Sequence, residues 1–427
     1  MIRNPFSLFS SISRFNRDVK LLLLATGILS ISFFGIQALL KILYILRLGY
    51  GPEYVGLFGA SGALGYMAMS LPSGWLGERW GLSRMMAVGA LATTLGMVML
   101  PLTEALPLWA RDGWPIFSQV IQAGGYAMFS INFVPALMAA TSPENRNSAY
   151  ALSSTLRSLG TFVGTISGGL LPGLLAGFVG QGLDSPTPYR LGLWLGPVVA
   201  VIAIVPLLRM RERRAVSGDT EALPKGAFPL LPVGLLILFV SLSQAASATC
   251  QAFCNAYMDT ELTLSPATIG LIMGLGQFAA IFAPMVLPRM ARLRGNGWTL
   301  LVVTLGSAFS LIPLILFHHW LGAGLGSIAT LTLAAMYMPT LQVYQMEMIA
   351  QRWRSLTYGV VSMAMGLNFA LISFVGGLVI TGWSYATLFA LGLLFSVGGA
   401  GLMGLLVRKP GLITQGVAAR QVVGIGD

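Results

Sequence analysis

The chain has 427 residues, of which 56% are hydrophobic and only 9% are charged, and its mean hydropathy is +0.79. Soluble domains carry about 25% charged residues, so this composition excludes an ordinary soluble protein and indicates a membrane protein. The net charge of +11 is arranged as a membrane-orientation signal and not as a nucleic-acid-binding surface.

Long apolar segments recur along the whole chain. Most exceed the ~20 residues that a helix needs to cross a ~30 Å hydrocarbon core, and their uniform apolarity favours helices over the alternating pattern of a membrane β-barrel. We therefore expect an all-α polytopic membrane protein with twelve transmembrane helices. The predicted spans are roughly 19–48, 51–76, 85–104, 113–140, 148–178, 189–208, 229–258, 265–288, 298–317, 322–350, 355–382 and 384–407.

Lysine and arginine gather on one side of these predicted helices. Over loops and tails, 20 of them fall on the side of the N-terminus and 3, namely Arg47, Arg111 and Arg190, on the other. Because cytoplasmic loops are enriched in Lys and Arg, both termini are predicted to be cytoplasmic. The first apolar run has no small-residue cleavage site of a signal peptide. We expect a multi-pass protein of the plasma membrane, which in a bacterium is the inner membrane.

The two halves of the chain resemble each other. At an offset of 214 or 208 residues, the matching pairs are Pro52/Pro266, Gly56/Gly270, Gly81/Gly295, Arg146/Arg354, Tyr150/Tyr358 and Gly168-Gly169/Gly376-Gly377. A direct repeat predicts two pseudo-symmetric six-helix bundles with a substrate site between them near the membrane midplane. The predicted parts are a cytoplasmic N-terminal tail (1–18), a first bundle (19–208), a central cytoplasmic loop (209–228), a second bundle (229–408) and a cytoplasmic C-terminal tail (409–427).

The segment GWLGERWGLSR, residues 74–84, resembles the loop signature of the major facilitator superfamily, G-x-L-x-D-R-x-G-R-K. Two positions that are basic in the family hold Leu82 and Ser83, and Arg84 is displaced by one. The residues that fit are Gly74, Leu76, Glu78 (for Asp), Arg79 and Gly81. Together with the twelve helices, the central loop and the repeat, this resemblance covers essentially the whole chain. It implies a secondary transporter that works by alternating access.

In the family, this loop has a gating role. A carboxylate at a helix end can accept hydrogen bonds from free backbone N–H groups and pair with nearby arginines. We therefore expect a cytoplasmic latch that breaks when the bundles move. The alternative is a solvated loop whose arginines only set the topology. The gating candidates are Gly74, Glu78, Arg79, Gly81, Arg84 and Arg146.

Four predicted helices carry polar residues at spacings of three, four and seven, which place them on one face. The resemblance implies that these helices, the first, fourth, seventh and tenth, line a central cavity. A polar substrate path is the prediction, and interhelical hydrogen bonding is the alternative. The stripes are Ser30, Gln37, Lys41 and Tyr44; Gln119, Gln122, Tyr126 and Ser130; Gln244, Ser247, Gln251 and Asn255; Tyr337, Thr340, Tyr344 and Glu347.

Two cations, Lys41 and Arg157, are predicted near the middle of the membrane, with Arg157 ~12 Å from the helix entry. A charge at this depth costs about 2.5–3.5 kcal/mol unless it is paired or hydrated. None of the 14 acidic residues is predicted at the same depth, so we expect an anionic or amphipathic substrate held by the two cations. Alternatively, Arg157 caps carbonyls or reaches Glu347, and Lys41 extends towards the membrane surface.

Energy coupling by protons needs a titratable group in the pathway. Glu347 is the candidate, and its alternative is an ion pair with Arg352 or Arg354. Two signatures of drug/proton antiporters are incomplete: the fourth helix lacks the signature arginine, and Thr165 replaces a proline in the fifth. The glycines of that second signature, which permit close helix packing, are Gly160, Gly164, Gly168 and Gly169.

The sequence thus favours efflux of an anionic or amphipathic small molecule, with H⁺ as a candidate coupling ion. Facilitated or proton-coupled uptake of a neutral sugar-like metabolite is the alternative, followed by a non-transporting membrane sensor on the same fold. No nucleophile–base pair or metal-ligand cluster stands out, so no enzyme, cofactor or metal site is expected. Cys250 and Cys254 share a helix face and are expected to be buried small side chains. The expected partners are the substrate and the lipid bilayer, not nucleic acid, and we expect a monomer.

Overall fold

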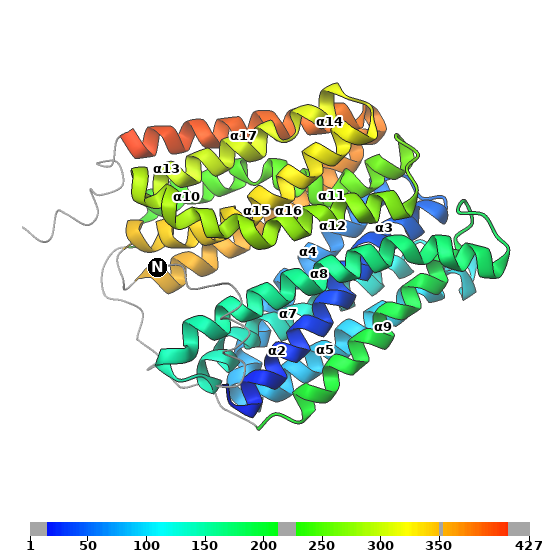
Figure 1. Cartoon of the computed structure of the whole chain (residues 1–427), viewed down its shortest axis with the longest axis horizontal. Coiled ribbons are helices and arrows are strands. Elements are labelled where there is room, and N and C mark those ends of the chain that lie inside the picture. The colour runs from blue at the N-terminus through cyan, green and yellow to red at the C-terminus, as the bar shows by residue number, and fades with distance from the viewer. Residues whose placement is uncertain (1–14, 212–227, 350–352, 409–427) are drawn as a thin grey trace, which may run out of the picture. The chain divides into compact units, whose positions relative to one another are not determined.

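The computed structural model describes residues 15–211, 228–349 and 353–408. The predicted C-terminal tail, most of the predicted N-terminal tail and central loop, and Arg352 therefore lie outside the described residues. Within these ranges every regular element is helical (Figure 1). Eleven helices are long and apolar enough to cross a membrane, and one of them, Pro266–Leu316, has 51 residues and contains two of the predicted spans. The predicted all-α polytopic fold is confirmed, and its twelve spans agree closely with this structure.

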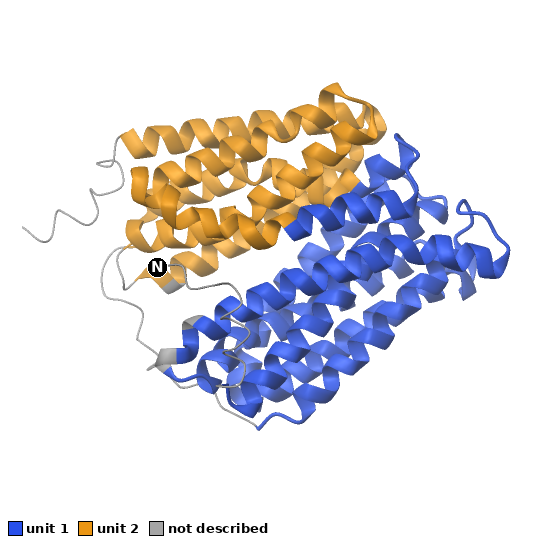
Figure 2. Cartoon of the chain, in the orientation of Figure 1, with its two compact units in different colours: residues 1–218, 255–278 blue, residues 219–254, 279–427 orange. Residues whose placement is uncertain are grey.

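The chain folds into two compact units, which Figure 2 shows in different colours. Unit 1 comprises residues 1–218 and 255–278, and unit 2 comprises residues 219–254 and 279–427. The segment 255–278, which follows the middle of the chain, thus belongs to the unit formed by the N-terminal half.

Unit 1 contains all described helices of the first half of the chain and parts of two helices from the second. They are α2 (Arg17–Leu29), the π-helix η2 (Ser30–Ile36), α3 (Gln37–Arg47), α4 (Pro52–Trp80), α5 (Leu82–Met99), the 3₁₀-helix η3 (Leu100–Ala105), α6 (Leu108–Arg111), α7 (Trp114–Ala140), α8 (Pro143–Val179), α9 (Thr187–Leu208), the end of α11 (Ala245–Thr260) and most of α12 (Pro266–Phe282).

Unit 2 contains the remaining helices. They are α10 (Leu230–Ser243), the first part of α11, the end of α12, the 3₁₀-helix η4 (Ala283–Val286), α13 (Leu287–Phe309), α14 (Ile312–Leu316), α15 (Trp320–Met348), α16 (Arg354–Gly382) and α17 (Tyr385–Arg408). Within this unit α13 packs against α15 and α17, and α10 packs against α16 and α17.

Proline and glycine mark equivalent positions of the sequence repeat. Pro52 and Pro266 stand at the start of α4 and α12, where the fixed φ of proline suits the first helical turn. Gly81 ends α4 with φ +103°, and Gly295 interrupts α13 with φ +84°. Because a residue with a side chain is strained at such a φ, the two glycines let the chain turn after each repeated helix.

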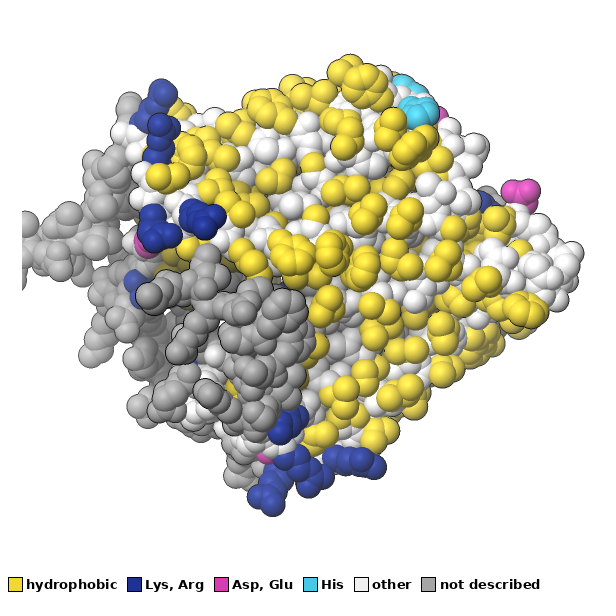
Figure 3. Space-filling view, viewed as in Figure 1, with side chains coloured by type: hydrophobic (Ala, Val, Ile, Leu, Met, Phe, Trp, Pro, Cys, Tyr) yellow, Lys and Arg dark blue, Asp and Glu magenta, His cyan; other side chains and the backbone are white. Residues whose placement is uncertain are grey.

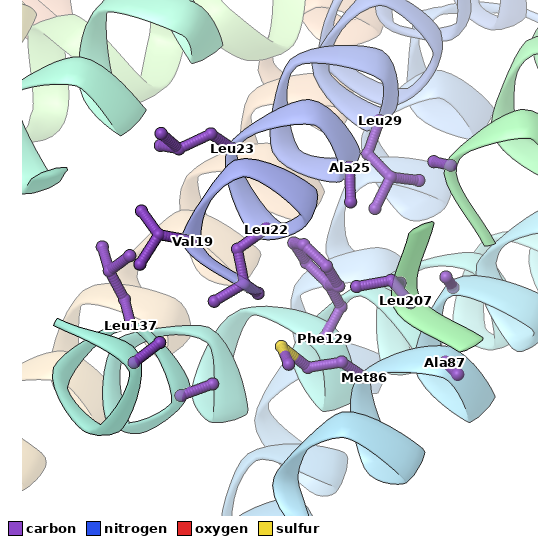
Figure 4. Packing of buried hydrophobic residues seen from close by; sticks show 14 of the residues in the cluster. Val19, Leu22, Leu23, Ala25, Leu29, Met86, Ala87, Phe129, Leu137 and Leu207 are labelled. Atoms are coloured by element: carbon purple, nitrogen blue, oxygen red, sulfur yellow. The ribbon is translucent and has the colours of Figure 1, made fainter. Parts of the chain in front are cut away.

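The core of unit 1 is built from helices that are far apart in the sequence. Leu22 of α2, Met86 of α5, Phe129 of α7 and Leu207 of α9 converge there, and each is at most 3% exposed (Figure 4). Many other large apolar side chains lie on the surface, as the space-filling view shows for one face (Figure 3). Lipid is as apolar as this core, so close van der Waals packing, and not burial from water, holds such helices together.

The glycines of α8 allow that close packing. A Cβ atom at Gly164 would collide with the backbone of Ile31 in η2, and one at Gly160 would lie 2.5 Å from the carbonyl oxygen of Gly27 in α2. A Cβ atom at Gly169 would meet the backbone of Gly270 in α12 at 2.7 Å. The predicted close contacts of the fifth transmembrane helix are therefore confirmed.

Candidate functional site

The first membrane helix contains a π-helical stretch, η2, between α2 and α3. Two aromatic side chains of η2, Phe33 and Phe34, pack against Tyr126 of α7. The ring of Phe33 stacks on Tyr126 with 4.4 Å between centroids, and Phe34 meets Tyr126 edge to face at 5.1 Å. We call Phe33, Phe34 and Tyr126 the aromatic cluster. All three side chains are half-buried. Single π-helical turns are rare in proteins, and those that occur are often found at functional sites. This part of unit 1 is therefore a candidate site.

Lys41 lies beside the aromatic cluster. Its Nζ donates a hydrogen bond to Oε1 of Gln119 at 3.0 Å, and it stands 5.6 Å from the ring centres of both Phe33 and Phe58. A Cβ atom at Gly62 of α4 would collide with the Gln119 amide. The glycine therefore provides the space in which Gln119 faces Lys41.

Arg157 of α8 is exposed and lies beside the Tyr126 hydroxyl. Both cations that the sequence predicts inside the membrane thus contact the aromatic cluster, Lys41 at the ring of Phe33 and Arg157 at Tyr126. Ring faces carry negative charge density and attract cations, but they do not neutralise them.

Two carboxylates contact side chains of α3, and each of them forms an ion pair with an arginine and not with Lys41. Glu104 accepts a hydrogen bond from the Tyr44 hydroxyl and pairs with Arg190, with 3.1 Å for each contact. Asp259 forms a bidentate pair with Arg47. Among the described residues, Lys41 has no carboxylate within ion-pair distance, so its polar partner is the neutral Gln119.

The pair between Arg47 and Asp259 escaped the sequence analysis. Its two contacts measure 2.6 and 2.7 Å, the Asp259 side chain is 1% exposed, and Arg47 also donates to the Leu183 carbonyl at 2.8 Å. These residues stand near the ends of the first helix of each repeat, 212 positions apart. Opposite charges at nearly equivalent repeat positions could have indicated the pair.

Other polar residues of the predicted stripes in unit 1 contact neighbouring helices. Gln37 is fully buried and donates to the Leu193 carbonyl of α9 at 3.1 Å. The backbone of Gln122 packs against Gly96 of α5, and its buried Nε2 has no hydrogen-bond partner. Of the predicted binding residues, Lys41, Gln119, Tyr126 and Arg157 are brought together, whereas Gln37 makes an interhelical hydrogen bond.

The predicted residues of unit 2 are spread along α11 and α15. Gln244 falls at the break between α10 and α11, and the exposed Gln251 bonds to Ser247 at 3.3 Å. The buried Tyr337 shares a short hydrogen bond with Ser243, which joins α15 to α10. Cys250 and Cys254 are fully buried free thiols, as expected.

Glu347 lies near the end of α15, three residues after Tyr344. It is exposed, and its Oε1 accepts a hydrogen bond from Asn296 at 2.6 Å. Arg354, one of its predicted alternative partners, donates to the Ile349 carbonyl at 3.2 Å. The proton-coupling role of Glu347 stays a prediction.

Five of the six gating candidates lie near the end of α4 or the start of α5, and Arg146 lies on α8. Glu78 and Arg79 are exposed, and the Arg79 guanidinium lies 5.4 Å from the ring centre of Trp75. The turn contains Gly81, whose positive φ is described above, and Arg146 of α8 is half-buried with an unpartnered Nε. The latch that would join Glu78, Arg79, Arg84 and Arg146 stays a prediction.

Residues 22–253, more than half of the chain, match the family model of the Major Facilitator Superfamily. The chain belongs to this superfamily. The resemblance of the loop at residues 74–84 is therefore confirmed by an independent comparison. No curated protein matches the sequence significantly.

Solved structures of transporters share the fold. A mutant of the nucleoside transporter NupG has a TM-score of 0.72 at 15% identity, over 90% of this chain and 99% of that chain. A bacterial homologue of the human lysosomal transporter Spinster has a TM-score of 0.66 at 15% identity, over 91% of this chain and 96% of that chain. The peptide transporter POT has a TM-score of 0.68 at 15% identity, over 93% of this chain and 95% of that chain. At these identities the likeness establishes the fold, and the family and fold together indicate a multi-pass membrane transporter and not an enzyme.

Proposed function

We propose that this chain is a secondary active transporter that exports a small anionic or amphipathic organic molecule by alternating access. The observation that carries the proposal is Lys41, an ammonium inside a membrane helix whose polar partner is a neutral amide. Such a charge is costly in a bilayer, and an anionic substrate would compensate it during each transport cycle. Arg157, beside the same aromatic cluster, adds a second donor that can hold a carboxylate or phosphate.

We further propose that the protein lies in a bacterial inner membrane as a monomer with both termini in the cytoplasm. The asymmetric distribution of Lys and Arg in the sequence supports this orientation. In this orientation, the pair of Arg47 and Asp259 lies at the outer ends of α3 and α11, and the turn at Gly81 lies on the cytoplasmic side. The predicted bundles at 19–208 and 229–408 would then move against each other while the latch at Glu78 and Arg79 opens and closes.

Proton coupling is proposed for Glu347. Its exposed carboxylate is bonded to a neutral amide at 2.6 Å, so a proton could be taken up and released there. The test is Glu347→Gln, which should abolish export driven by a pH gradient while leaving substrate exchange without a gradient. If gradient-driven export persists in Glu347→Gln, this residue is not the coupling group.

Uptake of a neutral sugar-like metabolite is the second candidate. The amides of Gln119, Gln122, Gln244 and Gln251 favour it, since amides donate and accept hydrogen bonds and carry no charge. A sensor without transport activity is the third candidate.

The experiment that separates these functions is counterflow in proteoliposomes. Organic anions, neutral sugars and a cationic dye are compared for the wild type and for Arg157→Gln. Saturable exchange of an anion that falls in Arg157→Gln supports the proposal. Exchange of a neutral or cationic solute that survives the substitution contradicts it, and no exchange of any solute favours the sensor.

A further inference from the structure

We infer that the transported anion is an aromatic carboxylate, whose ring packs on the cluster of Phe33, Phe34 and Tyr126 and whose carboxylate binds Lys41. This inference rests on the proposed function, because it names the substrate class of the same site. It is carried by the joint position of rings and cations within unit 1 and goes beyond the family and the fold.

The rings provide the first part of the evidence. Phe33, Phe34 and Tyr126 touch one another at centroid distances of 4.4 to 5.1 Å, and Tyr66 extends the group at 6.3 Å from Tyr126. All four side chains are half-buried, so part of each remains accessible. Offset or edge-to-face contacts with such a surface favour another aromatic ring over an alkyl group of the same size.

The cations provide the second part. Lys41 stands against the ring of Phe33 and has two ammonium hydrogens left after its bond to Gln119. Arg157 lies beside the Tyr126 hydroxyl. A carboxylate attached to an aromatic ring could therefore contact Lys41 while its ring lies on the cluster, and an acceptor on the far side of the ring could reach Arg157.

Hydrogen-bond partners around the cluster argue against a sugar. Oε1 of Gln119 accepts from Lys41, and the Tyr66 hydroxyl is bonded to Ser130 at 3.0 Å. Tyr44, the next polar residue along α3, is bonded to Glu104. A sugar hydroxyl could accept from the open ammonium hydrogens of Lys41 as a carboxylate does, but only the carboxylate would also compensate the positive charge.

The test compares three probes of similar size in counterflow: benzoate, cyclohexanecarboxylate and benzyl alcohol. The aromatic inference predicts that benzoate exchanges about 2- to 10-fold better than cyclohexanecarboxylate, the range expected for ring–ring contacts. It also predicts little exchange of the neutral benzyl alcohol. Equal exchange of the two carboxylates would overturn the aromatic inference and leave the proposed anion transport intact. Failure of both carboxylates, with exchange of a neutral or cationic solute, would overturn the inference and the proposed function together.

A substitution ties the preference to the cluster. Phe33→Leu keeps an apolar side chain and removes one ring, so the ratio of benzoate exchange to cyclohexanecarboxylate exchange should shrink towards unity. Phe117→Leu is the matched control, because Phe117 lies on α7 and is 53% exposed, and it should keep the full preference. An unchanged preference in Phe33→Leu would overturn the assignment to the cluster. The comparison of probes on the wild type decides the aromatic inference even where the variant fails to fold.

Discussion

Two cations on α3, Lys41 and Arg47, lie six residues apart and have opposite surroundings. Arg47 has a buried carboxylate on two of its nitrogens and a backbone carbonyl on the third. Lys41 has one neutral amide and two ring faces. The first charge is compensated by the protein itself, and the second is not.

We interpret this difference as one between a structural charge, Arg47, and the proposed substrate-binding charge, Lys41. A charge whose partners are all supplied by the chain stabilises the fold, and removing one partner exposes the other to an apolar environment. A cation without an anionic partner inside a membrane helix raises the free energy of the folded protein in the bilayer. Such a residue is by default a candidate for binding or transport. Substitutions at Asp259, Lys41, Gly62 and Tyr44 should therefore affect stability and exchange differently.

The largest effect is expected for Asp259→Asn. It leaves Arg47 without its carboxylate, and breaking a buried pair from one side costs about 3–5 kcal/mol. The variant should melt at a clearly lower temperature in detergent, measured by intrinsic fluorescence. Asp184→Asn, at an exposed position, is the control and should melt like the wild type. The double variant Arg47→Gln/Asp259→Asn should recover part of the loss, and an undiminished melting temperature in Asp259→Asn alone would contradict the structural role.

Lys41→Gln should have the opposite effect on the protein without substrate. It removes an uncompensated charge whose cost is about 2.5–3.5 kcal/mol at the bilayer centre, so the variant should melt at the same temperature as the wild type or higher, in lipid nanodiscs. Arg47→Gln, the same kind of change six residues on, should melt lower. A loss of stability in Lys41→Gln as large as that in Arg47→Gln would remove the contrast between the two cations.

Gly62→Ala tests how Lys41 is held. The new Cβ atom would collide with the Gln119 amide, and such overpacking costs about 1–3 kcal/mol. Because Gln119 must move, the rate of anion exchange should fall clearly, whereas the melting temperature should fall only slightly. Gly234→Ala is a suitable control, since nothing lies within 4 Å of a Cβ atom at Gly234. Normal exchange in Gly62→Ala would show that Gln119 does not position Lys41.

Tyr44→Phe should have the smallest effect. It removes the hydroxyl that bonds Glu104, but Glu104 keeps its pair with Arg190 at 3.1 Å. Because the carboxylate keeps its arginine, the loss should stay below about 1.5–3 kcal/mol, the contribution of a hydrogen bond to a charged group, and appear as a slight decrease in melting temperature. Anion exchange should be unchanged. A strong loss of exchange would mean that Glu104 acts on Lys41 and would contradict the contrast between Lys41 and Arg47.

The sequence predicts the fold because its information is redundant. Each span is set by many apolar residues, and the repeat at Pro52/Pro266 and Gly81/Gly295 returns as helix starts and turns of positive φ. The site is predicted only in part. The lack of a carboxylate at the depth of Lys41 is predicted by placing 14 acidic residues along the chain, and among the described residues none lies within ion-pair distance of Lys41.

Contacts between helices explain what the sequence leaves open. Gln37 and Lys41 lie four residues apart on α3, yet Gln37 bonds to α9 and Lys41 to α7, because the direction of a partner depends on neighbours that spacing does not reveal. The π-helical turn that presents Phe33 and Phe34 changes the periodicity on which a stripe analysis rests. The aromatic cluster could not be separated from ordinary apolar packing in the sequence.

The central claim is that the ammonium of Lys41 is the counter-charge of the transported anion. Its most direct test is the exchange of benzoate in proteoliposomes by the wild type, Lys41→Gln and Lys20→Gln, which has the same substitution at an exposed lysine of α2. A hydrogen bond to a charged group contributes about 1.5–3 kcal/mol. Lys41→Gln should therefore raise the benzoate concentration at half-maximal exchange by about 10- to 150-fold, while Lys20→Gln should match the wild type. Equal half-saturation in all three proteins would contradict the claim.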